Sequence, residues 1–229
     1  MEELQTAPAV SSTPQPATTT GWRRFLGIRW VIAAMLFLAA ILNYIDRQTL
    51  SILAVTIQKD LGLSDAQYGD VANYFLMAYT ISLLLSGRLV DYLGARFSMA
   101  IFITWWSVSN MATALARSFT SLCMCRFSLG LGEAGNWPSS TKVVSEWFPA
   151  KERGVAIGFY TLGATVGATV APVIVTWIVA RYDWRFAFLV TGAIGLLWVV
   201  PWLLIYRRPR EHPWISKEEL NLVTSEAQV

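Results

Sequence analysis

The sequence predicts an all-α membrane protein with six transmembrane helices, and three observations lead to that prediction. The 229 residues are 55% hydrophobic and only 14% charged, with a mean hydropathy of +0.46, whereas about a quarter of the residues in a soluble domain are charged. Six apolar stretches reach the roughly 20 residues that a helix needs to cross a bilayer. Eleven tryptophans suit a protein with two membrane interfaces, where this residue gathers.

The chain divides into a polar start, an apolar middle and a polar end. Residues 1–29, rich in Thr, Pro, Ser and Ala, are expected to form a disordered cytoplasmic tail. A signal peptide is disfavoured, because the apolar run that follows is too long and contains charges. Residues 207–229 are expected to form a cytoplasmic tail, in which Ser216 is a candidate N-cap of a short amphipathic helix. Residues 30–206 are expected to form the six-helix bundle, with spans near 30–56, 70–87, 97–116, 119–147, 154–180 and 186–206.

Basic residues predict the orientation of this bundle. Apart from Arg47 and Arg126, Lys and Arg fall 12 on one side of the membrane and 4 on the other. Because Lys and Arg are enriched in cytoplasmic loops, we expect the N-terminus, the even-numbered loops and the C-terminus to face the cytoplasm.

Composition excludes several classes of function. No continuous basic stretch with interleaved aromatic residues is present, so nucleic acid is not an expected partner. Cys123 and Cys125 point about 200° apart on a helix, so neither a disulfide nor a metal pair is expected. The single histidine, His212, lies outside the spans, and we expect no metal site and no cofactor. No arrangement of nucleophile, base and oxyanion donors is visible, so an enzyme is not expected.

Two pairs of charged residues lie inside apolar spans. Asp46 and Arg47 are neighbours in the first span, and Arg126 and Glu133 lie two helical turns apart in the fourth. A charge at membrane depth costs roughly 2.5 to 3.5 kcal/mol, so these four residues are functional candidates. Guanidinium groups bind carboxylates bidentately, and buried carboxyls can exchange protons near neutral pH. We predict that Arg47 and Arg126 bind an anion while Asp46 and Glu133 couple it to protons. Structural ion pairs, Asp46 with Arg47 and Glu133 with Arg126, are the alternative.

Three further polar residues are weaker candidates for the same anion site. Tyr79 lies near the middle of the second span and is positioned to reach the cavity. Tyr44 is a candidate as well, although a tyrosine in a span often serves packing or interface anchoring. Asn43 precedes Arg47 by one helical turn and is expected to orient it.

The segment between the second and third spans reads GRLVDYLGAR, from Gly87 to Arg96. It resembles the signature loop of the major facilitator superfamily, which has Gly, Leu, Asp, Gly and a basic residue at these spacings. By this resemblance Gly87, Asp91, Gly94 and Arg96 are gating residues that latch the two halves of a transporter. A tight cytoplasmic turn, with basic residues placed by topology, is the alternative.

The fifth span contains two Gly-x-x-x-Gly pairs, Gly154 with Gly158 and Gly163 with Gly167. Small residues at this spacing let helices approach closely. The pattern resembles the fifth helix of major facilitators, which packs against the other half of the transporter. Packing within this half is the alternative.

Four motifs resemble one family of the superfamily, the anion:cation symporters. They are NYIDR, GEAGNWP, EWFPAKER and YRRPREHP, which occur in this order. The resemblance extends over about residues 28–219, and it is nearest to the bacterial hexuronate transporters, with the aldonate transporters next. It implies that the matching acids, Asp46 and Glu133, couple protons. It also implies that Arg47, Tyr79 and Arg126 handle the anion.

The resemblance implies proton-coupled symport of a hexuronate across the inner, cytoplasmic membrane. Aldonate transporters carry a sugar-binding amide in the fifth helix, where this chain has Tyr160, Thr161, Gly163 and Ala164, which favours another sugar acid. Major facilitators have two six-helix halves with the site between them, and this chain resembles the first half, so a C-terminal half is an expected partner. An aldonate-type transporter, an anion sensor and a truncated half that does not transport alone are the alternatives.

Overall fold

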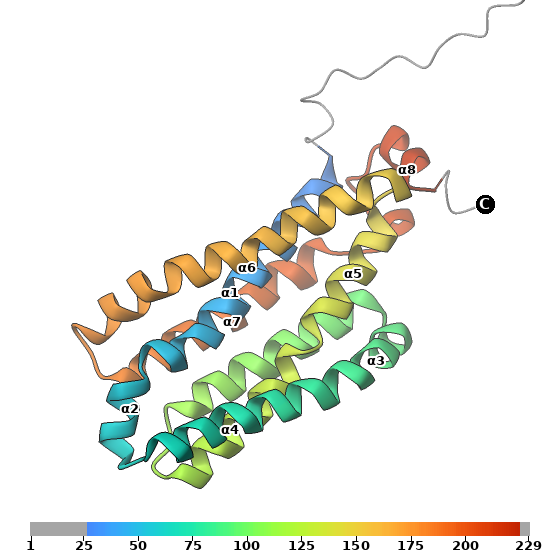
Figure 1. The fold of residues 1–229 in the computed structure, drawn as a ribbon. Helices are drawn as coiled ribbons and strands as arrows, with labels where there is room; N and C mark the ends of the chain where they lie inside the picture. The colour runs from blue at the N-terminus through green and yellow to red at the C-terminus, as the bar shows by residue number, and fades with distance from the viewer. Residues whose placement is uncertain (1–26, 225–229) are drawn as a thin grey trace, which may run out of the picture.

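The computed structural model describes residues 27–224, and the ordered elements in that range are helices (Figure 1). Of the expected tail, residues 1–29, residues 1–26 lie outside the described residues. The first helix already begins at Ile28, so Arg29 belongs to it rather than to the tail. The helices are α1 (Ile28–Ile52), α2 (Ala54–Leu61), α3 (Asp65–Thr113), α4 (Phe119–Glu133), α5 (Asn136–Trp147), α6 (Ala150–Val179), α7 (Trp184–Ile205), the short 3-10 helix η2 (Pro209–Glu211) and α8 (Lys217–Thr224).

Six passes through a membrane can be traced in these helices. Within residues 27–224, α1, α3, α6 and α7 are long and apolar enough to span. The 49 residues of α3 would be roughly 70 Å long as one rod, more than twice the hydrocarbon core. The two arms of α3 instead run alongside each other and supply two passes (Figure 1). The shorter α4 and α5, interrupted at Ala134 and Gly135, together supply one more.

The predicted signature loop is almost entirely helical. Within Gly87–Arg96 only Gly94 leaves the helical conformation, with φ 77° and ψ 159°, a combination that residues with a Cβ adopt only under strain. The tight turn, which was the alternative interpretation of this segment, is limited to one glycine at which the helix reverses.

Two glycines of α6 allow it to pack closely on α1, beside which it runs (Figure 1). A Cβ at Gly163 would lie 2.4 Å from the Phe37 carbonyl oxygen, and one at Gly167 would lie 2.5 Å from the Ile41 carbonyl oxygen. A Cβ at Gly154 or Gly158 would meet nothing within 4 Å. The second glycine pair thus packs within this half of the fold, as in the alternative reading of the sequence, and the first does not.

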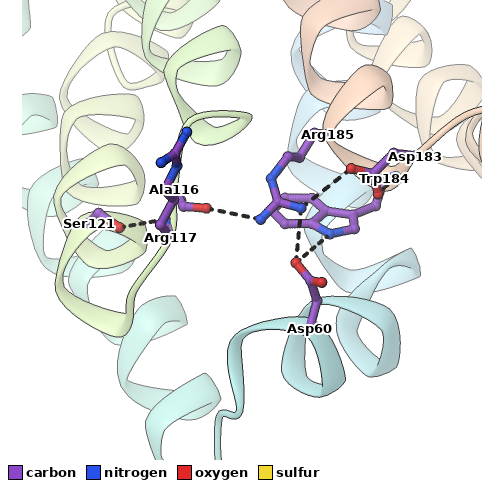
Figure 2. Close-up of polar contacts among 7 residues, drawn as sticks. All are labelled: Asp60, Ala116, Arg117, Ser121, Asp183, Trp184 and Arg185. Carbon is purple, nitrogen blue, oxygen red and sulfur yellow. Dashed lines mark hydrogen bonds and ion pairs between the residues drawn. The ribbon is translucent and has the colours of Figure 1, made fainter.

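At the end of the bundle far from α8, Arg185 connects three segments (Figure 2). Its Nη1 lies 2.9 Å from Asp60 Oδ2 of α2 and 3.3 Å from Asp183 Oδ2, and its Nη2 donates to the Ala116 carbonyl at 3.4 Å. Trp184 Nε1 donates to the same Asp60 oxygen at 3.2 Å. These partly exposed contacts each stabilise the fold weakly, but together they connect α2, the α3–α4 turn and α7.

At the opposite end the C-terminal segment docks onto the start of α1. Glu219 of α8 accepts hydrogen bonds from the backbone N–H groups of Ile28 at 3.3 Å and Arg29 at 3.1 Å. The N-cap residue of α1 supplies no side-chain cap, so Glu219 takes that function, and its charge also suits a helix N-terminus. The expected cap of α8 is confirmed, since Ser216 Oγ accepts from Glu219 N at 3.1 Å.

His212 caps the end of α7. Its Nδ1 accepts from the Trp214 N–H at 3.2 Å, which leaves Nε2 as the protonated nitrogen, 3.0 Å from the Ile205 carbonyl. The residue is 5% exposed, and burial lowers the pKa of His212 below its ordinary value of 6.5. The neutral ring therefore helps to dock the segment that follows α7.

Candidate functional site

Arg47 of α1 and Glu133 of α4 form an ion pair between helices. Arg47 Nε and Nη2 donate to Glu133 Oε2 at 3.0 and 2.8 Å. The Glu133 side chain is fully buried, and that of Arg47 is 29% exposed. The sequence suggested two other ion pairs, Asp46 with Arg47 and Glu133 with Arg126, and both of these pairings are wrong. Adjacent residues on a helix point about 100° apart, so Arg47 faces α4 while Asp46 faces elsewhere.

Aromatic rings surround the Arg47 guanidinium. Its central carbon lies 5.3 Å from the Tyr44 ring, 5.3 Å from Phe75 and 4.8 Å from Tyr79, within the range of cation–π attraction. The structure therefore brings the two candidate tyrosines to Arg47. Phe75 was not predicted because it is apolar, although it lies one turn before Tyr79 on the same helix face.

Arg126 of α4 is the second cation of the site. It is 2% exposed, and its guanidinium carbon lies 5.4 Å from the Phe75 ring. Its Nε and Nη1 have no hydrogen-bond partner within residues 27–224. Glu133 and Asp46 are close enough to act on it electrostatically, yet neither hydrogen-bonds these two nitrogens. A buried guanidinium with free donors is costly unless an anion meets it.

Asp46 lies in a separate network of neutral polar residues. Its Oδ1 accepts from Asn110 Nδ2 at 2.7 Å, and the same nitrogen donates to Thr191 Oγ1 at 2.8 Å. All three side chains are buried, and Asp46 Oδ2 has no partner within residues 27–224. Sequence reasoning missed Asn110 and Thr191. An amide inside the third span was the available signal, since polar groups at membrane depth tend to be functional.

Asn43 does not hydrogen-bond Arg47. It is fully buried, and both its side-chain Nδ2 and Oδ1 lack partners within residues 27–224. Glu133 orients Arg47 instead, since its carboxylate engages two of the guanidinium nitrogens.

The predicted gating residues divide between two helix contacts. Asp91 Oδ1 pairs with Lys142 Nζ of α5 at 3.1 Å. Gly87, Asp91 and Lys142 line an open hollow of about 500 Å³ between α3 and α5. Arg96 does not pair with Asp91. Its Nη2 donates to the Leu203 carbonyl, and its own carbonyl accepts from Trp202 Nε1 at 2.9 Å, so it links α3 to α7.

Several known proteins are similar in sequence to most of this chain. The model of the Major Facilitator Superfamily matches residues 36–226. The hexuronate transporter of Escherichia coli (strain K12) is 36% identical over 201 residues, which cover 88% of this chain and 46% of that protein. The galacturonate transporter of Dickeya chrysanthemi is 36% identical, covering 87% and 58%. The D-galactonate transporter of Escherichia coli O6:H1 is 34% identical, covering 92% and 48%.

Solved structures share the fold. A bacterial homologue of the human lysosomal transporter Spinster, inward-facing and occupied, has a TM-score of 0.72 and 27% identity over 80% of this chain and 45% of its own. The inward-open xylose transporter XylE from Escherichia coli has a TM-score of 0.71 over 87% and 52%, and its 18% identity speaks for the fold alone. The chain spans about half the length of the curated relatives it matches, which are membrane transporters and not enzymes. The chain belongs to the Major Facilitator Superfamily, as a multi-pass membrane protein whose helices form the N-terminal half of that fold.

Proposed function

We propose that this protein, completed by a C-terminal six-helix half, carries a sugar acid together with protons across the inner membrane, with both termini in the cytoplasm. The observation behind the proposal is the buried Arg126 guanidinium with unpartnered Nε and Nη1, which shares the Phe75 ring with Arg47. Two fixed cations on facing helices suit a carboxylate ligand. The relatives named as hexuronate and galacturonate transporters support a uronate as the substrate.

The Arg47–Glu133 pair suggests how anion and proton are coupled. Arg47 Nε and Nη2 both bind Glu133 Oε2, so a substrate carboxylate must compete with Glu133 for them. Protonation removes the charge of Glu133 and frees Arg47 for the substrate. When Glu133 loses its proton on the cytoplasmic side, it recaptures Arg47 and displaces the anion. Binding of anion and proton is then coupled through one shared guanidinium.

Asp46 supplies the second proton site in this proposal. It hydrogen-bonds Asn110 rather than either arginine, so its charge is not neutralised by a direct ion pair. It acts on Arg126 and Glu133 through space. Protonating Asp46 therefore changes the net charge around the anion site without blocking it.

The gate is proposed to lie at the cytoplasmic reversal of α3, around Gly94. Lys142 holds Asp91 in an exposed pair, and exposed pairs are weak enough to exchange partners. Gly94 permits the reversal between the arms of α3, Gly87 leaves the hollow beside Asp91 open, and Arg96 anchors the second arm to α7.

Uptake measurements test the proposal. Cells produce the chain with and without a C-terminal six-helix half from a hexuronate relative, and uptake of labelled glucuronate is measured with unlabelled galacturonate or galactonate as competitor. We expect uptake only with both halves, and stronger competition by galacturonate than by galactonate. Stronger competition by galactonate would favour the aldonate-type transporter instead.

Variants of the completed protein test the residue roles. Glu133→Gln and Asp46→Asn are expected to abolish accumulation driven by a proton gradient, and Arg126→Gln is expected to abolish uptake. Glu218→Gln, which alters an exposed acid of α8, is the matched control and should leave uptake unchanged. Proton-driven accumulation that survives both acid substitutions would refute the assignment of these carboxyls.

A further inference from the structure

Asn110 and Thr191 are buried polar residues without a role in the mechanism above. Asn110 of α3 is 0% exposed and Thr191 of α7 is 3% exposed. Burying an amide and a hydroxyl is unfavourable unless they hydrogen-bond. The acceptors of the Asn110 amide group are Asp46 Oδ1 and Thr191 Oγ1. Hydrogen bonds from one atom, Asn110 Nδ2, therefore connect three helices, α1, α3 and α7.

The hydrogen bonds have the directions expected for an ionised Asp46. Nδ2 donates one hydrogen to the carboxylate at 2.7 Å and the other to the threonine hydroxyl at 2.8 Å. The carbonyl oxygen of the Asn110 amide has no partner within residues 27–224. An ionised carboxylate only accepts, so the donor end of the amide must face it.

A protonated Asp46 reverses these requirements. Its carboxyl then carries an O–H that needs an acceptor, and the amide provides one if it turns over by about 180° and presents Oδ1. A threonine hydroxyl both donates and accepts, so Thr191 can rotate its O–H toward the same Oδ1. The same two side chains can thus hydrogen-bond Asp46 with and without its proton, which a leucine at position 110 could not do.

The charged side chains near Asp46 do not hydrogen-bond it within residues 27–224, whereas Asn110 does. Glu133 and Arg126 face Asp46 from α4 and act through space. Arg47, on the same helix as Asp46, is engaged by Glu133. Within residues 27–224, Asn110 donates the hydrogen bond to Asp46 Oδ1, which is the oxygen that carries the proton when the amide turns over, and Thr191 and Trp106 also lie close enough to act on the carboxyl.

We propose that Asn110 and Thr191 are positioning residues for Asp46, and that the Asn110 amide turns over as Asp46 gains or loses its proton. The pair keeps the buried Asp46 carboxyl hydrogen-bonded in both charge states, so that it can gain and lose a proton without losing its hydrogen-bond partner. The proposal rests on the proposed function only in taking Asp46 as a proton site. The turnover is a property of this bundle and is measured without transport.

Infrared difference spectroscopy on the purified 229-residue chain in lipid nanodiscs tests the proposal. The C=O stretch of protonated Asp46 is followed as pH is varied and is assigned by its loss in Asp46→Asn. We expect bands of isotope-labelled asparagine side-chain amide to change at the same pH as this stretch, and to stop doing so in Asp46→Asn and in Asn110→Leu.

Substitutions give the expected size of the effect. Asn110→Leu removes a hydrogen bond from both forms of Asp46, and the bond to the ionised carboxylate is about twice as strong as the bond to the neutral carboxyl. The pH at which the Asp46 stretch is half-maximal should therefore rise by about one unit. Thr191→Val should raise it by less, and Thr191→Ser, which keeps the hydroxyl, should leave it unchanged. Asn73→Leu, at an exposed asparagine of the same helix, is the matched control.

Two results would overturn the inference. One is an asparagine amide band that stays constant while Asp46 titrates. The other is a half-maximal pH in Asn110→Leu equal to that of Asn73→Leu. If Asn110→Leu does not fold, the comparison of Thr191→Val with Thr191→Ser decides, and equal half-maximal pH values would refute the pair. Loss of sugar-acid uptake with an intact infrared response refutes the transport proposal alone.

Discussion

Replacing Gly163 with alanine should force α1 and α6 apart. The added methyl carbon would lie 2.4 Å from the Phe37 carbonyl oxygen and 3.1 Å from Ala40 Cβ, well inside van der Waals contact. The Phe37 carbonyl belongs to the backbone of α1, so it cannot rotate away as a side chain would. The helices must shift, and the shift loses contacts along their shared surface.

The size of this effect follows from two opposing terms. Overpacking a tight contact costs about 1 to 3 kcal/mol, whereas exchanging glycine for alanine inside a helix gains about 0.5 to 1 kcal/mol. Gly158→Ala in the same helix meets nothing within 4 Å, so only the favourable term applies there. The difference in unfolding free energy between the two variants isolates the packing term, and we expect about 1 to 3 kcal/mol.

Reversible unfolding of the purified chain in detergent, followed by tryptophan fluorescence, measures this difference. Gly163→Ala should unfold at lower denaturant than the parent chain, and Gly158→Ala at equal or higher denaturant. Equal midpoints for the two variants would refute the close contact of α6 with α1. Destabilisation by Gly158→Ala alone would place the packing surface at the first glycine pair instead.

Three further predictions concern the end of the bundle that contains the reversal of α3 and α8. Gly94→Ala should lower the unfolding free energy by about 1 to 3 kcal/mol, because φ 77° and ψ 159° strain any residue with a Cβ. A Cβ at Gly87 would meet nothing within 4 Å, so Gly87→Ala should change the unfolding free energy by less than about 0.5 kcal/mol. Equal denaturation midpoints for the Gly94→Ala and Gly87→Ala variants would contradict the strain at Gly94. Glu219→Gln weakens the cap of α1 and should lower the free energy of docking of α8 by about 0.5 to 2 kcal/mol. Hydrogen exchange in α8 should then be faster than in the parent chain, whereas Glu218→Gln should leave it unchanged. Burial lowers the pKa of His212, so the unfolded chain binds more protons below about pH 6.5 and docking of the segment after α7 weakens as pH falls. Protection factors there, which correct for the intrinsic slowing of amide exchange in acid, should fall as pH falls, and unchanged protection factors would oppose this.

The spans and the four buried charges were predictable because each is a local signal. A run of about 20 apolar residues is sufficient for a membrane helix whatever it packs against. Asp46, Arg47, Arg126 and Glu133 were conspicuous because a charge inside such a run is costly wherever it points. The motifs around them likewise depend only on residue order.

Pairing among those residues was not predictable, because it depends on helices distant in the sequence. Arg47 and Glu133 are 86 positions apart, and their contact exists only because the fold brings α1 and α4 within reach of each other's side chains. Asn110 and Thr191, neutral residues in apolar spans, gave little signal until α3 and α7 brought them to Asp46.

The sequence by itself determined a six-pass helical membrane protein of the Major Facilitator Superfamily with four charges at membrane depth. Apolar length, the cost of buried charge and motif order decide these features without reference to packing. Only the tertiary structure decided that Glu133 binds Arg47, that Asp46 turns instead to Asn110, and that Gly163 rather than Gly158 contacts α1. The physical reason is that helix periodicity gives the direction of each side chain about its own axis, whereas a partner is set by which helix occupies that direction.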